Sequence, residues 1–542
     1  MTTISGHIVD VINREIYNGI LNIEDGKIIK ILLSENVENQ YIIPGFVDAH
    51  IHIESSMMIP TEFARYSLIH GTVACVCDPH EIANVCGLDG VDYMIDNAKQ
   101  SPMKFYFGAP SCVPSTSFET SGAILDAADV EKLLQRDDIH FLSEMMNSPG
   151  VIHKNKQVHL KLDVAKRLGK PIDGHAPGLM GDDLKKYAAG GITTDHECMT
   201  IAEAEEKIAL GMKVLIREGS AAKNFDDLLP LLINNAADIM FCSDDKHPDD
   251  LLKNGHINAL IRRAVEKGYD VMDMLRACSL NPILHYKLDV GLLQKGDSAD
   301  FSIVNNLTDF EIKATYVQGE KVSENGVPCF TRFVPTELIN QFNAQKITKE
   351  QLIVKPSGSK LKVIKVDDGQ LFTHAVFCKP KIENNNVVSD IENDVLKLVV
   401  YNRYQPSTPA VGFIHNIGLK CGALASTVSH DSHNIVAVGT SDEEIVSAIN
   451  QIIDSKGGIL ACNGEHTCLL SLPVGGLMSD AEGTAIAQKY EEVDAMAKEL
   501  GSTLRAPFMT VAFMSLVVIP ELKLSDKGLF DVRTFSFTNL ME

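Results

Sequence analysis

The chain has 542 residues, of which 45% are apolar and 22% charged, so it can form several domains and has the composition of a globular protein. Its formal net charge of −23 disfavours binding to nucleic acid, because the phosphate backbone would be repelled. No apolar run reaches the roughly 20 residues of a membrane span, and the first residues lack the layout of a secretory signal. We therefore expect a cytoplasmic protein that contacts neither nucleic acid nor a membrane.

The twelve cysteines are scattered singly, except for the close pair Cys75 and Cys77. They lie in apolar runs such as "TVACVCDP", which is typical of reduced, buried thiols. A zinc site at Cys75 and Cys77 would require a second close pair, so we expect core cysteines here.

Residues 1–43 alternate apolar and polar side chains and are interrupted at Asn18-Gly19 and Asp25-Gly26, a pattern that predicts short strands joined by turns. The same pattern returns in residues 289–335. We expect the two stretches to form one small β-sandwich domain that flanks the region between them.

Residues 44–288 alternate short apolar runs with helical stretches such as "DAADVEKLLQRDD" and "GDDLKKYAAG". Eight strands that alternate with helices predict an α/β fold, a (β/α)8 TIM-like barrel, whose chemistry lies at the carboxyl ends of the strands. The eight predicted strands lie in "YIIPGFVDAHIH", "TVACVCDP", "MKFYFGAP", "IHFLSEMMN", "KPIDGHAPG", "GITTDHE", "KVLIREGS" and "ADIMFCSDD".

Residues 336–542 mix strand-like runs with two clear helix patterns, which predicts a separate C-terminal α+β domain. One helix should begin at a capping box formed by Ser441 and Glu444. The other carries an apolar stripe and should end at Gly501. The stripe consists of Ile486, Tyr490, Val493, Ala497 and Leu500.

Polar residues suited to metal binding stand at the ends of five predicted barrel strands. His50 and His52 are two residues apart, so both side chains can point to one side of their strand and hold one ion. A carboxylate can bridge two cations, which makes Glu144 the natural shared ligand. His175 and His196 would complete a second metal site, and Asp244 would bind the first metal and hold a proton of the attacking water. The predicted ligands are His50, His52, Glu144, His175, His196 and Asp244.

"PGFVDAHIHIES", followed by this series of strand-end residues, resembles the amidohydrolase superfamily of metal-dependent hydrolases. "DPHEIANVCG", "DGHAPG" and "DDKHPDDL", with "ACNGEHTCLLSLPVGGLMSD" near the C-terminus, resemble the adenine deaminase family within it. The resemblance implies that adenine is hydrolysed to hypoxanthine and ammonia by attack of metal-activated hydroxide at C6, in purine salvage. It also implies two divalent cations. Mn²⁺ is the favoured metal, Fe²⁺ is the next choice, and Zn²⁺ is an open alternative.

Carried over residue by residue, the resemblance places His50 and His52 on the first metal and His175 and His196 on the second. Glu144 bridges the two, where many relatives use a modified lysine. Asp244 is then the catalytic proton carrier, although its neighbour Asp245 could face the metals instead. We also expect a homodimer or a higher homo-oligomer.

A second proton donor is unassigned, and four residues beside the strand ends are candidates for substrate contact. Glu54 could instead orient His50 or His52, and His80 and Glu81 could cap the following helix. Glu197 should point away from the site if its strand continues. Arg217 and Glu218 are expected to pair with each other, with substrate contact as the alternative. The candidates are Glu54, His80, Glu81 and Glu197.

A further polar cluster lies in the C-terminal region, with His430, Asp431 and His433 in "VSHDSHN" and His466 in "NGEHTC". It could hold a third metal. We favour a loop without metal, or a segment that closes over the barrel mouth or over a neighbouring subunit.

Two other functions compete with deamination of adenine. One is another barrel hydrolase that acts on a cyclic amide or a different aminated heterocycle. The other is a barrel without catalysis, which we disfavour because all six predicted ligands are present.

Overall fold

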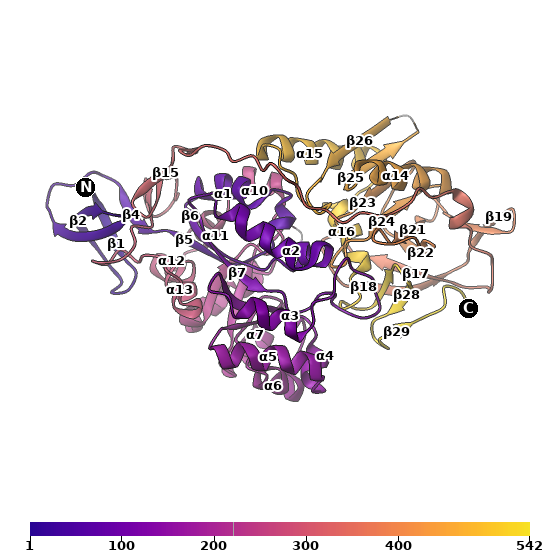
Figure 1. The fold of residues 1–542 in the computed structure, drawn as a ribbon, viewed down its shortest axis with the longest axis horizontal. Helices are drawn as coiled ribbons and strands as arrows, with labels where there is room; N and C mark the ends of the chain where they lie inside the picture. Colours follow the sequence, from indigo (N-terminus) through magenta and orange to yellow (C-terminus); the bar gives the residue numbers. More distant parts are fainter. Residues whose placement is uncertain (221, 465) are drawn as a thin grey trace.

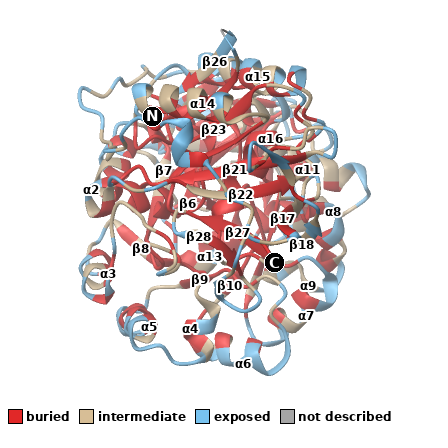
Figure 2. Ribbon diagram, turned by 90° about the vertical axis from the view of Figure 1, so that its right-hand side faces the viewer, coloured by how far each residue is buried: buried red, intermediate tan, exposed pale blue. Residues whose placement is uncertain are grey.

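The computed structural model describes residues 1–220, 222–464 and 466–542. A small sheet with the N-terminus lies at one end of the long axis, the barrel follows, and a second sheet-rich unit with the C-terminus lies at the other end (Figure 1). Buried residues concentrate on the strands, whereas exposed residues lie on the outer helices and loops (Figure 2). In the described part of the chain, no helix combines the length and the apolar character that crossing a membrane requires.

The small sheet combines strands from both sides of the barrel, as the sequence predicts. Hydrogen bonds join all eight strands into one sheet, and side chains from both halves, such as Leu21 and Phe301, pack in one core. The connection between its two halves is the antiparallel pairing of β4 with β13, in which Ile43 lies opposite Ser302. The strands are β1 (Thr2–Asp10), β2 (Glu15–Glu24), β3 (Lys27–Leu33), β4 (Tyr41–Pro44), β13 (Phe301–Val304), β14 (Ile312–Val317), β15 (Glu320–Glu324) and β16 (Val327–Pro328).

Eight parallel strands form the barrel, and all eight predicted runs are confirmed. Hydrogen bonds group them into a sheet of five and a sheet of three. A bridge from Ile51 to Asp244 joins the first strand to the last, and the Thr193 N–H donates to Ile172 O where the two sheets meet. The strands are β5 (Phe46–Ile51), β6 (Thr72–Cys77), β7 (Lys104–Ala109), β8 (Ile139–Met145), β9 (Ile172–Gly174), β10 (Thr194–Asp195), β11 (Lys213–Arg217) and β12 (Ile239–Cys242).

Helices follow the barrel strands and cover the outside of the barrel (Figure 1). At the start of α3, the Asp126 carboxylate accepts from the backbone N–H groups of Ala128 and Asp129 in a capping box. The predicted helical stretches are confirmed. The helices are α1 (Pro60–Leu68), α2 (His80–Ala98), α3 (Ala127–Leu134), α4 (Ser148–Ile152), α5 (Lys156–Leu168), α6 (Gly181–Ala189), α7 (Ile201–Ala209), α8 (Phe225–Leu228), α9 (Leu232–Asn235), α10 (Pro248–Asn254), α11 (Ile257–Glu266), α12 (Val271–Ala277) and α13 (Leu280–Tyr286).

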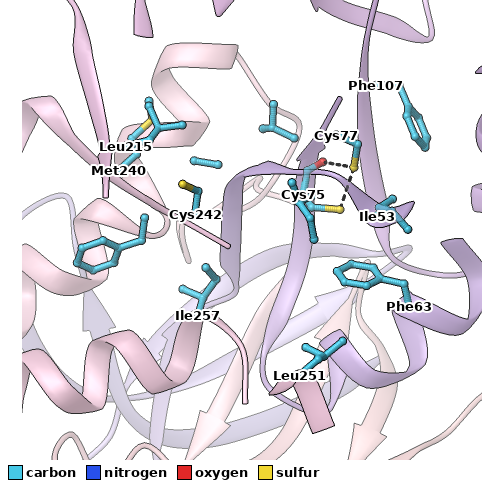
Figure 3. Packing of buried hydrophobic residues seen from close by; sticks show 14 of the residues in the cluster. Ile53, Phe63, Cys75, Cys77, Phe107, Leu215, Met240, Cys242, Leu251 and Ile257 are labelled. Atoms are coloured by element: carbon cyan, nitrogen blue, oxygen red, sulfur yellow. Dashed lines mark hydrogen bonds between the residues drawn. The ribbon is translucent and has the colours of Figure 1, made fainter. Parts of the chain in front are cut away.

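The cysteine pair of β6 belongs to the barrel core. Cys75 and Cys77 pack among apolar side chains that include Ile53, Phe63 and Phe107 (Figure 3). Burial raises the pKa of both thiols, which opposes the thiolate form that a zinc ligand requires. The interpretation as core cysteines is confirmed.

The C-terminal unit is α+β, as predicted, and contains a second eight-stranded sheet, in the order β18-β17-β22-β21-β24-β23-β25-β26. The Ser441 side chain caps α14, and the apolar stripe of α15 is buried from Ile486 to Ala497. The division of the chain at residues 43, 288 and 335 stays a prediction. The strands of the sheet are β17 (Leu361–Val366), β18 (Thr373–Cys378), β21 (Val395–Tyr401), β22 (Ala410–His415), β23 (Ala423–Ser426), β24 (Ile435–Gly439), β25 (Gly458–Asn463) and β26 (His466–Ser471).

Smaller elements complete this unit. The strands β19 (Lys381–Glu383) and β20 (Asn386–Val388) form a hairpin. The strands β27 (Leu522–Ser525), β28 (Gly528–Asp531) and β29 (Ser536–Phe537) form a three-stranded sheet near the C-terminus. The helices are α14 (Asp442–Ser455), α15 (Gly483–Glu499) and α16 (Pro507–Ala512).

Candidate metal centre and active site

The structure brings all six predicted ligands together at the carboxyl ends of the barrel strands. Each lies in its strand or within two residues of the strand's last residue, and all are buried. The ends of parallel strands meet at one mouth of a barrel, so residues distant in sequence become neighbours. We call this set the barrel cluster: His50, His52, Glu144, His175, His196 and Asp244.

Glu144 lies at the centre of the barrel cluster. Its Oε2 is 2.9 Å from His175 Nδ1 and 3.1 Å from His196 Nε2. Its other oxygen, Oε1, is 3.6 Å from His52 Nε2. One carboxylate therefore faces imidazoles from three different strands, which is the position that a shared ligand of two cations requires.

His50 and His52 direct their ring nitrogens to one point, as their spacing predicts. Their Nε2 atoms are 3.2 Å apart, and Asp244 Oδ1 is 3.7 Å from the first and 3.4 Å from the second. The ring of His50 also stacks on that of His196, with centroids 4.2 Å apart. Burial, together with the imidazoles of His196 and His52, lowers the pKa of His50 well below its ordinary value. The neutral form, which is the form that binds metals, is therefore favoured.

The barrel cluster fits divalent cations by the chemistry of its donors. His50 Nδ1 and His175 Nε2 are buried and have no hydrogen-bond partner among the residues that the structure describes. Several overlapping groups of three or four donors lie within 4.8 Å of one another, such as Glu144 with His175 and His196. His50 and His196 also form one of these groups with Asp244, so the assignment of individual ligands to each metal stays a prediction.

Arg217, the last residue of β11, holds two carboxylates of the site. Its Nη1 donates to Asp244 Oδ2 at 2.6 Å, and its Nη2 donates to Glu197 Oε2 at 2.8 Å. Burial alone would raise the pKa of Asp244, but Arg217 and His52 hold it well below its ordinary value. The expected pairing of Arg217 with Glu218 is therefore wrong, and Glu218 accepts from Arg263 instead.

Glu197 also corrects an expectation. Because β10 ends at Asp195, the alternation of a strand does not continue, and Glu197 faces the site. Its Oε1 is 3.5 Å from both His175 Nδ1 and His196 Nε2. Glu197 thus connects two predicted metal ligands to Arg217.

Glu54 neither lines the cavity nor contacts His50 or His52 by a hydrogen bond, in contrast to the two roles expected from the sequence. Its Oε1 accepts from the Ile82 N–H at 3.1 Å, and its Oε2 has no partner in the described part of the chain. It therefore holds the first turn of α2, where the backbone N–H groups lack helical partners, rather than His50 or His52. Burial raises its pKa to about 7.

Two further carboxylates hold the segments around the predicted metal ligands. Asp245 Oδ1 accepts from Ser55 Oγ at 2.5 Å, whereas Asp244 faces the imidazoles. Asp48 accepts from the Ser243 N–H at 3.0 Å and so joins β5 to the segment after β12.

The sequence reasoning missed Asp78, which follows β6 directly. Its Oδ2 is 3.2 Å from His80 Nδ1 and accepts from the Glu144 N–H at 3.3 Å. His80 Nδ1 in turn lies 3.6 Å from Glu144 Oε1. The signal was present in "CVCDPHE", because the same rule of polar residues at strand ends applies to β6.

The C-terminal unit closes over the barrel mouth through Glu81. Its Oε1 is 2.7 Å from His430 Nδ1, and its Oε2 accepts from His433 Nε2. His433 Nδ1 accepts from the Ser429 N–H, so both of its ring nitrogens are used. We call Glu81, His430 and His433 the interface cluster. The structure shows that this loop closes over the barrel mouth, and because the interface cluster is also one of the groups that could hold a metal ion, the third metal stays an open prediction.

A cavity lies between the barrel cluster and the C-terminal unit. Its polar wall is the barrel cluster except His50, together with His80, Glu197 and Arg217, and its opposite wall comes from the C-terminal unit. A neighbouring pocket shares Glu197 and Arg217 with it. The opposite wall consists of Leu371, His430, Asp431, Phe513, Leu516 and Ile519.

A parallel barrel that gathers buried imidazoles and carboxylates at the carboxyl ends of its strands is the arrangement of a metal-dependent barrel hydrolase. The amidohydrolase family model matches residues 41–322, and the model of the adenine deaminase C-terminal domain matches residues 370–536. The chain belongs to the amidohydrolase family and, within it, to the adenine deaminases.

Individual relatives are similar in sequence to this chain along its whole length. The adenine deaminase of Methanosarcina mazei is 52% identical, with 99% of this chain and 98% of the relative covered. That of Parabacteroides distasonis is 49% identical with the same coverage. Among solved structures, the β-aspartyl dipeptidase of Fervidobacterium islandicum covers 61% of this chain and 100% of its own, at 16% identity and a TM-score of 0.47.

Proposed function

We propose that the chain is an adenine aminohydrolase, which converts adenine and water to hypoxanthine and ammonia. The observation that carries the proposal is the barrel cluster, in which Glu144 lies between imidazoles of three strands. Relatives about 50% identical over nearly the whole chain bear the name adenine deaminase, which supports adenine as the substrate.

We propose that two divalent cations bind in the barrel cluster. His50 and His52 with Asp244 would hold one, His175 and His196 would hold the other, and Glu144 would be shared. Imidazole and carboxylate donors without thiolate suit Mn²⁺, with Fe²⁺ as the second choice. When bound, the cations would polarise a water molecule for attack at C6 of the purine.

The protein's own residues would move the protons. Asp244 Oδ1 faces His50 and His52, and its Oδ2 accepts from Arg217, so its carboxylate is held beside the position where the cations would bind the reacting water. It would take the water proton and deliver it to the leaving amine while the C6–O bond forms and the C6–N bond breaks. One of the candidates that line the cavity, His80, Glu81 or Glu197, would protonate the ring nitrogen and regain that proton from the hydroxyl formed at C6.

The experiment is an ammonia assay on the purified protein loaded with Mn²⁺, across adenine, other aminopurines and a cyclic amide such as a hydantoin. We expect ammonia from adenine in stoichiometric balance with hypoxanthine, and none from the cyclic amide. Ring opening of the cyclic amide without release of ammonia from adenine would contradict the proposal and favour another barrel hydrolase.

We also propose that copies of the chain associate and work in a reducing compartment, such as the cytoplasm. Leu33 on the edge strand β3 is 80% exposed, and Phe377 on the edge strand β18 is 49% exposed, so each edge offers an apolar contact. All twelve cysteines are free, which suits a reducing environment. Light scattering on the purified protein tests the association, and a monomeric mass would contradict it.

A further inference from the structure

Asp431 is a buried carboxylate without a use in the proposed mechanism. It lies in the loop between β23 and β24 and lines the cavity from the side of the C-terminal unit. The residue is 3% exposed, and its Oδ2 has no hydrogen-bond partner in residues 1–220, 222–464 and 466–542. Its Oδ1 is 3.9 Å from His80 Nε2, which is beyond hydrogen-bond distance.

The neighbours of Asp431 are all engaged in fixing the loop. His430 and His433 both bind Glu81, and the ring of His430 stacks on Phe513 at 4.3 Å. The carbonyl of Ser432 accepts from the Tyr404 hydroxyl at 2.6 Å. The position of Asp431 is therefore set before any ligand arrives, while its Oδ2 has no partner in the described part of the chain.

A buried carboxylate oxygen without a partner costs free energy, so native structures keep one where a ligand or an ion completes it. Here the completing group should be an N–H donor. The cations are expected at the barrel cluster, and the ring of His80 separates Asp431 from Glu144, with contacts of 3.6 Å on one side and 3.9 Å on the other.

The surroundings of Asp431 suit the far side of a flat heterocycle. Leu371, Leu516 and Ile519 contribute an apolar surface to the same wall of the cavity. A purine with C6 at the barrel cluster directs its five-membered ring away from the cations. That ring carries one N–H, which free purine bases have and nucleosides lack.

We propose that Asp431 accepts a hydrogen bond from the N–H of the purine's five-membered ring and thereby selects the free base. This inference rests on the proposed function, since it takes a purine as the ligand. It makes the C-terminal unit a direct part of substrate recognition.

The test measures binding by calorimetry, so that it does not depend on turnover. The ligands are purine and oxazolo[5,4-d]pyrimidine, in which oxygen replaces the ring N–H without added bulk. We expect the wild type to bind purine at least about tenfold more tightly, because a site built for an N–H leaves its acceptor unpaired with the analogue. Equal affinity of the wild type for the two ligands would overturn the proposal.

Two variants assign the selectivity to Asp431. Asp431→Leu has a similar size and no acceptor, so the preference should fall to within about threefold, while metal content and the thermal midpoint stay near those of the wild type. Asp431→Asn keeps one acceptor oxygen, so its preference for purine should lie between those of the wild type and Asp431→Leu. A preference unchanged in Asp431→Leu, or in Asp431→Asn if the leucine variant fails to fold, would refute the assignment. If purine binds selectively but adenine yields no ammonia, the proposed function fails and the recognition stands.

Discussion

The barrel cluster and the interface cluster face each other across one cavity and use the same residue types, yet their hydrogen bonding differs. In the interface cluster, both Glu81 oxygens bind an imidazole, and His433 uses both ring nitrogens. In the barrel cluster, His50 Nδ1 and His175 Nε2 lack partners in the described structure, and two Nε2 atoms lie 3.2 Å apart.

The difference separates two roles. A cluster whose donors and acceptors match is complete by itself and stabilises a contact between parts of the chain. A cluster whose imidazoles from several strands converge on shared carboxylates has the donor set that a cation between them would use. The histidine and carboxylate content of a motif alone therefore does not distinguish a metal site from a structural connection.

The strongest test of the comparison removes Glu144, the proposed shared ligand. Glu144→Gln should lower metal content and reduce kcat/KM by at least about 100-fold, since even indirect partners of metal ligands cost 10- to 100-fold. Elemental analysis and the ammonia assay measure both effects. Added Mn²⁺ should raise the thermal midpoint of the wild type but not of this variant. Full metal content and activity would show that Glu144 is no ligand.

Arg217→Met should give the next largest effect, a loss of about 10- to 100-fold in kcat/KM. The variant leaves the buried carboxylates of Asp244 and Glu197 without their cationic partner. Arg217→Lys is the matched control: it keeps the charge but not the two-pronged geometry, so it should recover only part of the loss. Wild-type kinetics in the methionine variant would contradict the positioning role.

Glu81→Gln tests the interface cluster and should behave differently. We expect the free energy of unfolding to fall by about 1–3 kcal/mol, because one buried hydrogen-bonding partner is lost. Metal content should remain at the wild-type level. Chemical denaturation and elemental analysis on the same preparation check both points, and loss of metal from this variant would place a cation in the interface cluster.

The last test concerns the pH dependence of stability through Lys523, which donates to the carbonyls of Leu371 and Phe513 behind the cavity wall. Burial lowers its pKa to about 7 from an ordinary value of 10.5. Between these values the unfolded chain binds more protons, so the free energy of unfolding should rise with pH, by up to about 1.4 kcal/mol per pH unit.

Lys523→Met should remove this contribution. Denaturation of both proteins at several pH values from 6.5 to 9 isolates it as a difference, because other titrating groups are common to both. If the free energy of unfolding changes with pH equally in the wild type and in Lys523→Met, the prediction is contradicted.

The sequence predicted the eight barrel strands and the six residues at their ends because hydrophobic runs and strand polarity are local properties. It misplaced Glu197 because the length of the two-residue strand β10 depends on its neighbours. It could not pair Arg217 with Asp244, or Glu81 with His430, since these contacts join separate loops after folding. The roles of the barrel residues as ligands remain predictions.

The pairing of β4 with β13 has a consequence for the order in which the molecule forms on the ribosome. Strand β4 ends at Pro44, and its partner begins at Phe301, so β4 can pair with β13 only after the whole barrel has been synthesised. Contacts this distant in sequence form slowly and leave strand edges exposed during synthesis. The cavity needs Ile519 as well, so a nascent chain acquires its complete substrate site only near the end of translation.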